Sequence, residues 1–144
     1  MATTTATVSV SSSDLTPGTP LNINASTTCM KAGLTTGLEI IEMGKNTLTV
    51  AESASSGVSL KLATAAGADG ASKVYLCNNA TDDTFYLRLD LHDTIVGRLY
   101  AGDWMFIPWN ASDNDAEIEI EPQGGTNIIE YCLFNSDVIL PTAG

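Results

Sequence analysis

The residues of this chain that could do chemistry are one histidine, three cysteines and a surplus of acids. His92 lies between Leu91 and Asp93, where we expect a hairpin turn. Members of a Ser-His-Asp triad come from distant segments, so spacing alone neither builds nor excludes one. No G-x-S-x-G nucleophile elbow accompanies His92, and a histidine in a turn is far more often solvated than a general base. We therefore expect no catalytic residues and no enzyme.

Metal-ligand spacing is also missing. Cys29, Cys77 and Cys132 lie roughly fifty residues apart, and no H-x-x-H or C-x-x-C pair occurs. Two oxygen-rich segments, Asp82-Asp83 and Asp113-Asn114-Asp115, offer the ligand type that calcium prefers, but they lack the ordered spacing of a calcium loop. We interpret both segments as solvated turns, with calcium binding as the alternative, and expect no metal site and no cofactor.

The charge balance narrows the choice of partners. Seventeen acids oppose six bases in 144 residues, which gives a formal net charge of −11 at pH 7. Nucleic-acid binding draws on clustered Lys and Arg, and the bases here are scattered singly. No apolar run approaches the ~20 residues of a membrane helix, and no secretory signal is visible. We expect no nucleic-acid partner, no membrane association and synthesis in the cytoplasm.

The elements that must position these residues are strands. Apolar and polar residues alternate with a period of two over 21–25, 58–62, 85–91 and 117–121. One face of each such strand would contact a core and the other would face water, as in antiparallel sheets. We place Glu117, Glu119 and Glu121 on a solvent face. The one helical candidate, 38–43, is too short to weigh against this pattern.

Turn residues separate these runs at short intervals, namely Pro17-Gly18, Asn78-Asn79, His92-Asp93, Ala101-Gly102-Asp103, 112–115 and Gly124-Gly125. Strands and turns of this kind predict an all-β fold of about ten short strands. The alternatives are an antiparallel β-sandwich and a jelly-roll-like barrel.

Length and composition predict a single β domain over residues 1–144. Apolar residues make up 44% of the chain, enough to build one core. The Thr- and Ser-rich residues 1–20 could form an extended N-terminal arm that reaches a neighbouring subunit. All nine aromatic residues lie within 73–140, where we expect the densest core. The Ala- and Gly-rich region 32–72 matches no pattern.

The most unusual segment is 97–109, because it is apolar on both faces of a predicted strand. Alternation places Trp104, Phe106 and Pro108 on one face, and Met105, Ile107 and Trp109 on the other. Pro108 cannot donate a ladder hydrogen bond, which indicates an edge strand or a strand end.

Two interpretations of this segment stay open: an edge that docks a partner, or a strand covered on both sides. Large aromatic side chains dominate interface energetics. We therefore take Trp104, Phe106 and Trp109, together with Tyr100, as the candidate protein-interface residues.

The run from Lys73 to Phe134 resembles the small head-decoration (cement) proteins of tailed bacteriophages and similar minor virion proteins. The resemblance rests on Val74–Asn79, on Gly97–Trp109, and on the hairpin around Pro122–Gly125 that leads into Ile128–Phe134. It implies a structural protein on the capsid exterior of the virion that joins neighbouring major capsid proteins, often as a homo-oligomeric trimer. The acidic charge agrees with an exterior position, because packaged DNA would repel it.

Three other functions compete with this one. A tail-tube, tail-tip or head-fibre component would share the β-rich, acidic character and differ only in its partner. A carbohydrate-binding module would use the tryptophans to stack on sugars, with 113–115 holding calcium. An enzyme such as a depolymerase fragment ranks last, because no catalytic set can be assembled.

Overall fold

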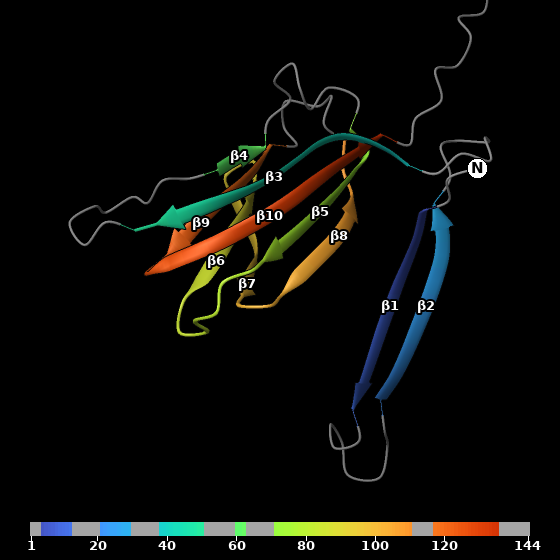
Figure 1. Cartoon of the computed structure of the whole chain (residues 1–144), viewed down its shortest axis with the longest axis horizontal. Helices are drawn as coiled ribbons and strands as arrows, with labels where there is room; N and C mark the ends of the chain where they lie inside the picture. Colours follow the sequence, from blue (N-terminus) through green and yellow to red (C-terminus); the bar gives the residue numbers. More distant parts are fainter. Residues whose placement is uncertain are drawn as a thin grey trace, which may run out of the picture. The chain divides into compact units, whose positions relative to one another are not determined.

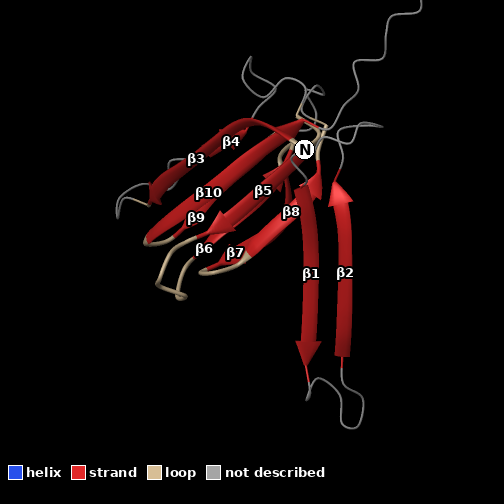
Figure 2. Cartoon of the chain, turned by 45° about the vertical axis from the view of Figure 1, so that its right-hand side comes forward, coloured by secondary structure: helices blue, strands red, loops and turns tan. Residues whose placement is uncertain are grey.

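The structure, a computed structural model, describes residues 4–12, 21–29, 38–50, 60–62, 71–110 and 117–135. These residues form ten strands and no helix, so the predicted all-β fold of about ten strands is confirmed (Figures 1 and 2). The predicted turns at Pro17-Gly18 and 112–115, and most of the region 32–72, lie outside the described residues.

Contacts divide the chain into two compact units. The first unit comprises Met1–Glu39 with Val138–Gly144, and the second comprises Ile40–Asp137. The expectation of a single domain stays a prediction, because a division by contacts does not say whether either unit folds by itself.

The first unit contains one antiparallel hairpin of two nine-residue strands, β1 (Thr4–Ser12) and β2 (Leu21–Cys29). The two strands pair along their whole length, from Thr4 opposite Cys29 to Ser12 opposite Leu21. The residues predicted to form an extended arm therefore include a paired strand. The amide of Leu38 donates a 3.0 Å hydrogen bond to Thr4 Oγ1 within the same unit.

The second unit contains two four-stranded sheets, with the orders β3-β10-β5-β8 and β4-β9-β6-β7. Its strands are β3 (Glu39–Thr49), β4 (Leu60–Leu62), β5 (Lys73–Asn78), β6 (Tyr86–Leu91), β7 (Thr94–Tyr100), β8 (Trp104–Pro108), β9 (Ile118–Gln123) and β10 (Thr126–Asn135). Pairing is nested, since β3 pairs with β10, β4 with β9, β5 with β8 and β6 with β7. This order is that of a double-sheet jelly roll, one long ribbon rolled into two sheets. The two sheets keep separate edges and form a sandwich, not a closed barrel.

The core lies between the two sheets and is built from the inward residues of alternating strands. Leu87 and Leu89 of β6 and Ile118 and Ile120 of β9 are all buried, as the alternation predicts. They meet the inward residues of the facing sheet, namely Val74, Leu76, Ile129, Tyr131 and Leu133. The period-two pattern thus selects the side chains that hold the sandwich together.

Three of the predicted turns lie where the sequence places them. His92 and Asp93 join β6 to β7 with φ angles of 44° and 61°, as a two-residue hairpin of type I′ requires. Gly102 lies in the turn before β8, and Gly124 and Gly125 join β9 to β10, all with positive φ. Only the His92–Asp93 turn joins two paired strands. The turns before β8 and before β10 lead from one sheet to the other, so the expected hairpin around Pro122–Gly125 is wrong: its two strands, β9 and β10, lie in different sheets.

Candidate docking surface

β8 is the edge strand of its sheet and pairs with β5 and no other described strand. Met105 and Ile107 pack against the core. Trp104, Phe106 and Pro108 alternate with them and therefore project from the outer face of the sheet. Pro108 is the last residue of β8, and the next amide, that of Trp109, still donates a 2.8 Å hydrogen bond to the carbonyl oxygen of Ser72. The missing amide of Pro108 therefore does not interrupt the pairing of β8 with β5.

The strand register brings Trp104 and Phe106 onto one surface with residues of β5 and β10. Three rows cross the outer face: Trp104–Cys77–Glu130, Phe106–Tyr75–Cys132 and Pro108–Lys73–Phe134. Directly opposite residues of antiparallel strands lie within reach of one another. We call the surface formed by Trp104, Phe106, Tyr75, Phe134, Cys77 and Cys132 the aromatic face.

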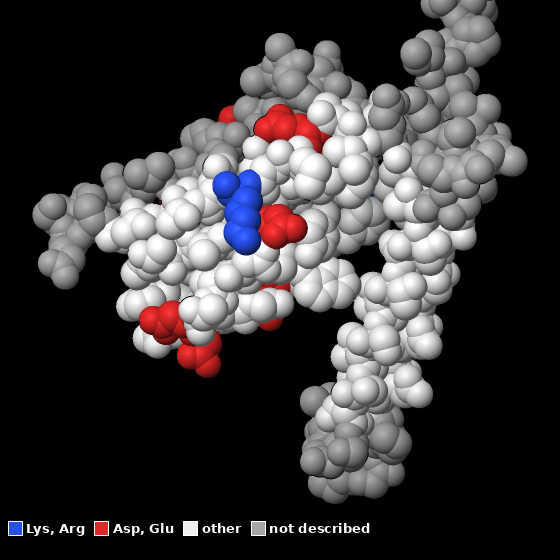
Figure 3. All heavy atoms as spheres, viewed as in Figure 1, with Lys and Arg blue, Asp and Glu red and all other residues white. Residues whose placement is uncertain are grey.

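The aromatic face is partly open to solvent. Trp104 is 49% exposed, whereas Phe106 and Phe134 are half-buried and contact each other edge to face, with ring centroids 5.9 Å apart. Figure 3 views the second unit from the side of β3, β10 and β5; most atoms on this side belong to uncharged residues, and one basic residue lies beside an acidic one near its centre. Contiguous exposed apolar surface of this kind marks interaction sites on soluble proteins.

Hydrogen bonds and burial act on three ionisable side chains of this sheet face, Tyr75, Cys132 and Glu130. A hydrogen bond with Cys77, reinforced by burial and by the charge of Glu130, raises the pKa of Tyr75 to about 12. Burial raises the pKa of the Cys132 thiol. Asn79 donates from Nδ2 to Glu130 Oε2 at 2.5 Å. Near neutral pH the side chains of Tyr75 and Cys132 are therefore uncharged.

The structure separates the other two sequence-predicted interface residues from Trp104 and Phe106. Tyr100 is 40% exposed but belongs to β7 of the second sheet. Its ring lies 5.3 Å from the ring of Tyr86, over which the Arg98 guanidinium stacks at 4.8 Å. Trp109 is only 6% exposed and lies in the core. The aromatic face therefore includes neither Tyr100 nor Trp109.

Two aromatic members of this face, Tyr75 and Phe134, were missed by sequence reasoning. Alternation within 73–78 and 126–135 assigns each residue to a face of its own strand. Only the pairing of β5 with both β8 and β10 places the two faces side by side.

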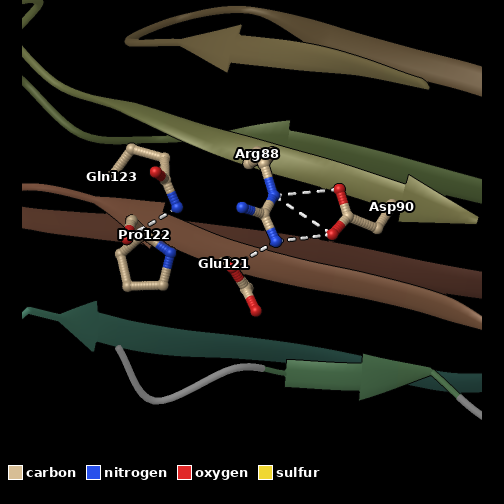
Figure 4. Close-up of polar contacts among 5 residues, drawn as sticks. All are labelled: Arg88, Asp90, Glu121, Pro122 and Gln123. Carbon is tan, nitrogen blue, oxygen red and sulfur yellow. Dashed lines mark hydrogen bonds and ion pairs between the residues drawn. The ribbon is translucent and has the colours of Figure 1, made fainter. Parts of the chain in front are cut away.

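The outer face of the second sheet has the opposite character, as Figure 4 shows. Arg88 Nη2 lies 2.7 Å from Asp90 Oδ2 and 2.6 Å from Glu121 Oε2, so one guanidinium ties β6 to β9. The expected charged face of β9 is thus paired across the sheet. The two outer faces of the sandwich differ: one aromatic, one ionic.

A cavity of about 320 Å³ opens at the side of the sandwich where β7 and β8 are the edge strands. Its walls are mostly aliphatic, including Leu76, Leu89, Val96, Met105 and Ile107. Asp90 also borders the cavity, but its carboxylate is already bound by Arg88.

The described residues hold no group of three His, Cys, Asp or Glu side chains that could bind a metal ion. Asp82 belongs to one of the two segments for which calcium binding was the alternative. Its carboxylate accepts a 2.9 Å hydrogen bond from the Thr84 amide, and this bond lowers the pKa of Asp82. The segment 113–115 lies outside the described residues. His92 is exposed at its turn, and no helix in the described part of the chain is long and apolar enough to cross a membrane.

Comparisons with models of protein families, with curated proteins and with solved structures find no match to this chain.

Proposed function

We propose that this protein is a bacteriophage capsid decoration (cement) protein, which binds the outer surface of an assembled capsid and stabilises it. Its partners would be the major capsid protein and further copies of itself. The observation that carries the proposal is the aromatic face, a group of aromatic and thiol side chains that Lys73 and Glu130 border, on an edge-strand sheet of a strongly acidic protein. A tail or head-fibre component is the alternative within the same structural class.

The aromatic face supports docking on a protein because its chemistry is that of an interface centre. Binding energy at interfaces concentrates in a few large side chains, tryptophan foremost, surrounded by contacts that exclude water. Trp104 stands 49% exposed, and the paired rings of Phe106 and Phe134 lie on the same face. A protein that binds only the assembled shell stabilises that shell by mass action.

Charge supports a position outside the shell. With a net charge of −11, the chain would be repelled by packaged DNA and tolerated on the exterior. The jelly-roll sandwich occurs in viral capsid domains and also in lectins, so the fold by itself does not choose between these functions.

The test is co-sedimentation with heads of the phage that encodes this chain, purified from a mutant that lacks the protein. We expect wild-type protein to sediment with the heads and raise the temperature at which they release DNA. Trp104→Ala should weaken binding by at least about tenfold, a typical hot-spot loss. Tyr100→Ala, an exposed aromatic on the other sheet, is the matched control and should bind normally.

Absence of binding to heads would overturn the proposal. Antibody labelling of intact virions separates the two structural functions, because a tail component would label tails and leave heads unlabelled.

Carbohydrate binding is favoured by one observation, the exposed indole of Trp104 on a β-sandwich face, since aromatic rings stack on sugars. A glycan array read with wild type and Trp104→Ala decides between the functions. Sugar binding that disappears in this variant, together with no binding to heads, would replace the capsid proposal.

A further inference from the structure

Gly97 leaves an inward position of the sandwich without a side chain. It lies opposite Leu89 in the pairing of β6 with β7, and Leu89 is buried in the core. Directly opposite residues of an antiparallel pair project to the same side, so a side chain at position 97 would point between the two sheets. The next inward pair of these strands, Leu87 with Leu99, fills its space. At Gly97, by contrast, an added Cβ would meet no atom within 4 Å.

The open space at Gly97 belongs to the cavity of about 320 Å³ between β7 and β8. Leu99 of β7 lines it from one sheet, and Met105 and Ile107 of β8 line it from the other. All residues that line it belong to the second unit. Protein interiors normally pack as densely as organic crystals and leave few voids larger than a water molecule. This cavity is instead as large as the smaller ligand pockets of proteins, which begin at about 300 Å³.

The backbone of β7 is irregular at the same place. Gly97 is opposite Leu89 and Ile95 is opposite Asp90, so Val96 has no opposite residue in β6. An extra residue of this kind is a β-bulge, a feature that bends its strand and is frequent beside functional sites. Val96 lines the cavity and is 58% exposed. The bulge and the missing side chain thus occur at adjacent residues of one edge strand.

The chemistry of the cavity walls favours a neutral aliphatic ligand. Among the described residues, those that line the cavity include no aromatic side chain on which a ring could stack. Two charged residues border it, and both are already engaged. Asp90 accepts hydrogen bonds from Arg88, and the guanidinium of Arg98 lies 4.8 Å from the ring centroid of Tyr86. A charged ligand would therefore bury its charge without a free partner, which is costly.

The size of the cavity limits the length of the ligand. An apolar cavity of ~150 Å³ holds one benzene molecule, so a cavity about twice as large has room for roughly ten carbon atoms. Packed sheets lie about 10 Å apart and their inward side chains interdigitate. A position without a side chain between them leaves a narrow space, which a linear chain fills better than a globular molecule.

We propose that the cavity at Gly97 is a binding site for a neutral aliphatic chain of roughly ten carbon atoms. The chain would lie between Leu89 of one sheet and Met105 and Ile107 of the other. This inference goes beyond the proposed function and does not depend on it. Met105 and Ile107 face the core, whereas Trp104 and Phe106 of the same strand face the opposite side.

The experiment is calorimetric titration of the full chain with the straight-chain alcohols from hexanol to decanol. One molecule should bind per chain, and each added methylene should tighten binding about fourfold, since a buried CH₂ contributes ~0.8 kcal/mol. Alcohols much longer than about ten carbons should gain no further affinity, because the cavity is then full. Decanoate should bind more weakly than decanol, because the charged groups at the cavity are already engaged.

Gly97→Leu places a side chain in the open space and should abolish decanol binding. The φ angle of Gly97 is not positive, so the substitution avoids left-handed strain, and the midpoint of urea unfolding should be no lower than in wild type. Met105→Phe fills the cavity from the facing sheet and should also weaken binding. Ile95→Thr is the matched control, because Ile95 is 62% exposed and does not line the cavity. This variant should bind decanol as wild type does.

Wild-type protein that binds none of the alcohols would overturn the inference. Decanol binding that persists in folded Gly97→Leu or Met105→Phe would overturn it too. Affinity that keeps rising in alcohols much longer than decanol, or that falls in Ile95→Thr, would show adsorption on exposed apolar surface instead. Binding to heads is measured separately with Trp104→Ala, so the failure of one proposal is distinguishable from the failure of the other.

Discussion

The side-chain amide of Asn78 donates a 3.2 Å hydrogen bond to Asn127 Oδ1 in the interior of the sandwich. It also donates to the carbonyl oxygen of Leu99 at 3.0 Å, and Asn127 donates to the carbonyl oxygen of Gly124 at 3.0 Å. Asn78 and Asn127 belong to one sheet and Leu99 to the other. Both asparagines are fully buried, so this polar network joins the two sheets.

We predict that Asn78→Ala lowers the free energy of unfolding by about 2–4 kcal/mol, because it leaves buried polar groups without partners. Urea unfolding measures the change. Asn127→Ala should cost a similar amount, and the double variant less than the sum, because the two residues share one network. Asn110→Ala, at an exposed position, should change stability by less than about 0.5 kcal/mol. Additive losses would show that the two asparagines do not act together.

The sandwich could be predicted because alternation is a local property of each strand. Leu87, Leu89 and Ile120 are buried where the pattern places them. The same pattern placed Asp90 on the solvent side, yet Asp90 is only 5% exposed. A register shift between Leu89 and Asp90 and the ion pair with Arg88 explain the difference. The ion pair lies within β6, but the register shift belongs to the pairing of β6 with β7 and cannot be read from one strand alone.

The candidate site was less predictable, because it depends on which strands pair with each other. Trp104 and Phe106 were found because the segment is unusual in itself. Tyr75 and Phe134 join them only through pairings between strands far apart in the sequence. The helical candidate at 38–43 lies largely in β3, because pairing with β10 outweighs the weak local preference.

The raised pKa of Tyr131 predicts how the stability of the protein changes at alkaline pH. Its hydroxyl donates a 2.6 Å hydrogen bond to Glu42 Oε1, and this bond with burial raises its pKa to about 12 from 10.0. The neutral phenol is thus favoured in the folded state. The resulting stability is fully present below pH 10 and is lost as the pH rises toward 12.

We therefore expect Tyr131→Phe to be less stable than wild type at pH 8, by about 0.5–1.5 kcal/mol, and the gap to shrink by pH 11.5. Urea unfolding at the two pH values measures both differences. Tyr75, whose pKa is also raised to about 12, contributes in the same window, so the double Phe variant should have the flattest profile. A gap that widens with pH would contradict this assignment.

Alanine substitutions at two glycines with positive φ, Gly102 and Gly125, can separate the cost of backbone strain from the cost of steric overlap. A Cβ on Gly125 would overlap the ring of Phe85, whereas a Cβ on Gly102 would meet no atom within 4 Å. We expect Gly102→Ala to cost about 1–2 kcal/mol from the left-handed backbone alone, and Gly125→Ala to cost more. Thermal unfolding ranks the two variants. In a Phe85→Ala background the Gly125→Ala penalty should fall to that of Gly102→Ala, and an unchanged penalty would refute the overlap.

The two tryptophans should have different roles: Trp109 should contribute to stability and Trp104 to binding. Trp109 is 6% exposed in the core, whereas Trp104 is 49% exposed on the aromatic face. Trp109→Ala should therefore lower the free energy of unfolding by about 3–5 kcal/mol, as large-to-small core substitutions do, while Trp104→Ala should cost less than about 1 kcal/mol. Urea unfolding measures both free-energy changes.

Co-sedimentation measures how each variant binds to heads. Trp104→Ala should lose head binding while fully folded, and Trp109→Phe, which keeps the core filled, should retain it. If Trp104→Ala lowered the free energy of unfolding as much as Trp109→Ala does, the indole of Trp104 would be a packing residue. The main observation in favour of a partner at the aromatic face would then be lost.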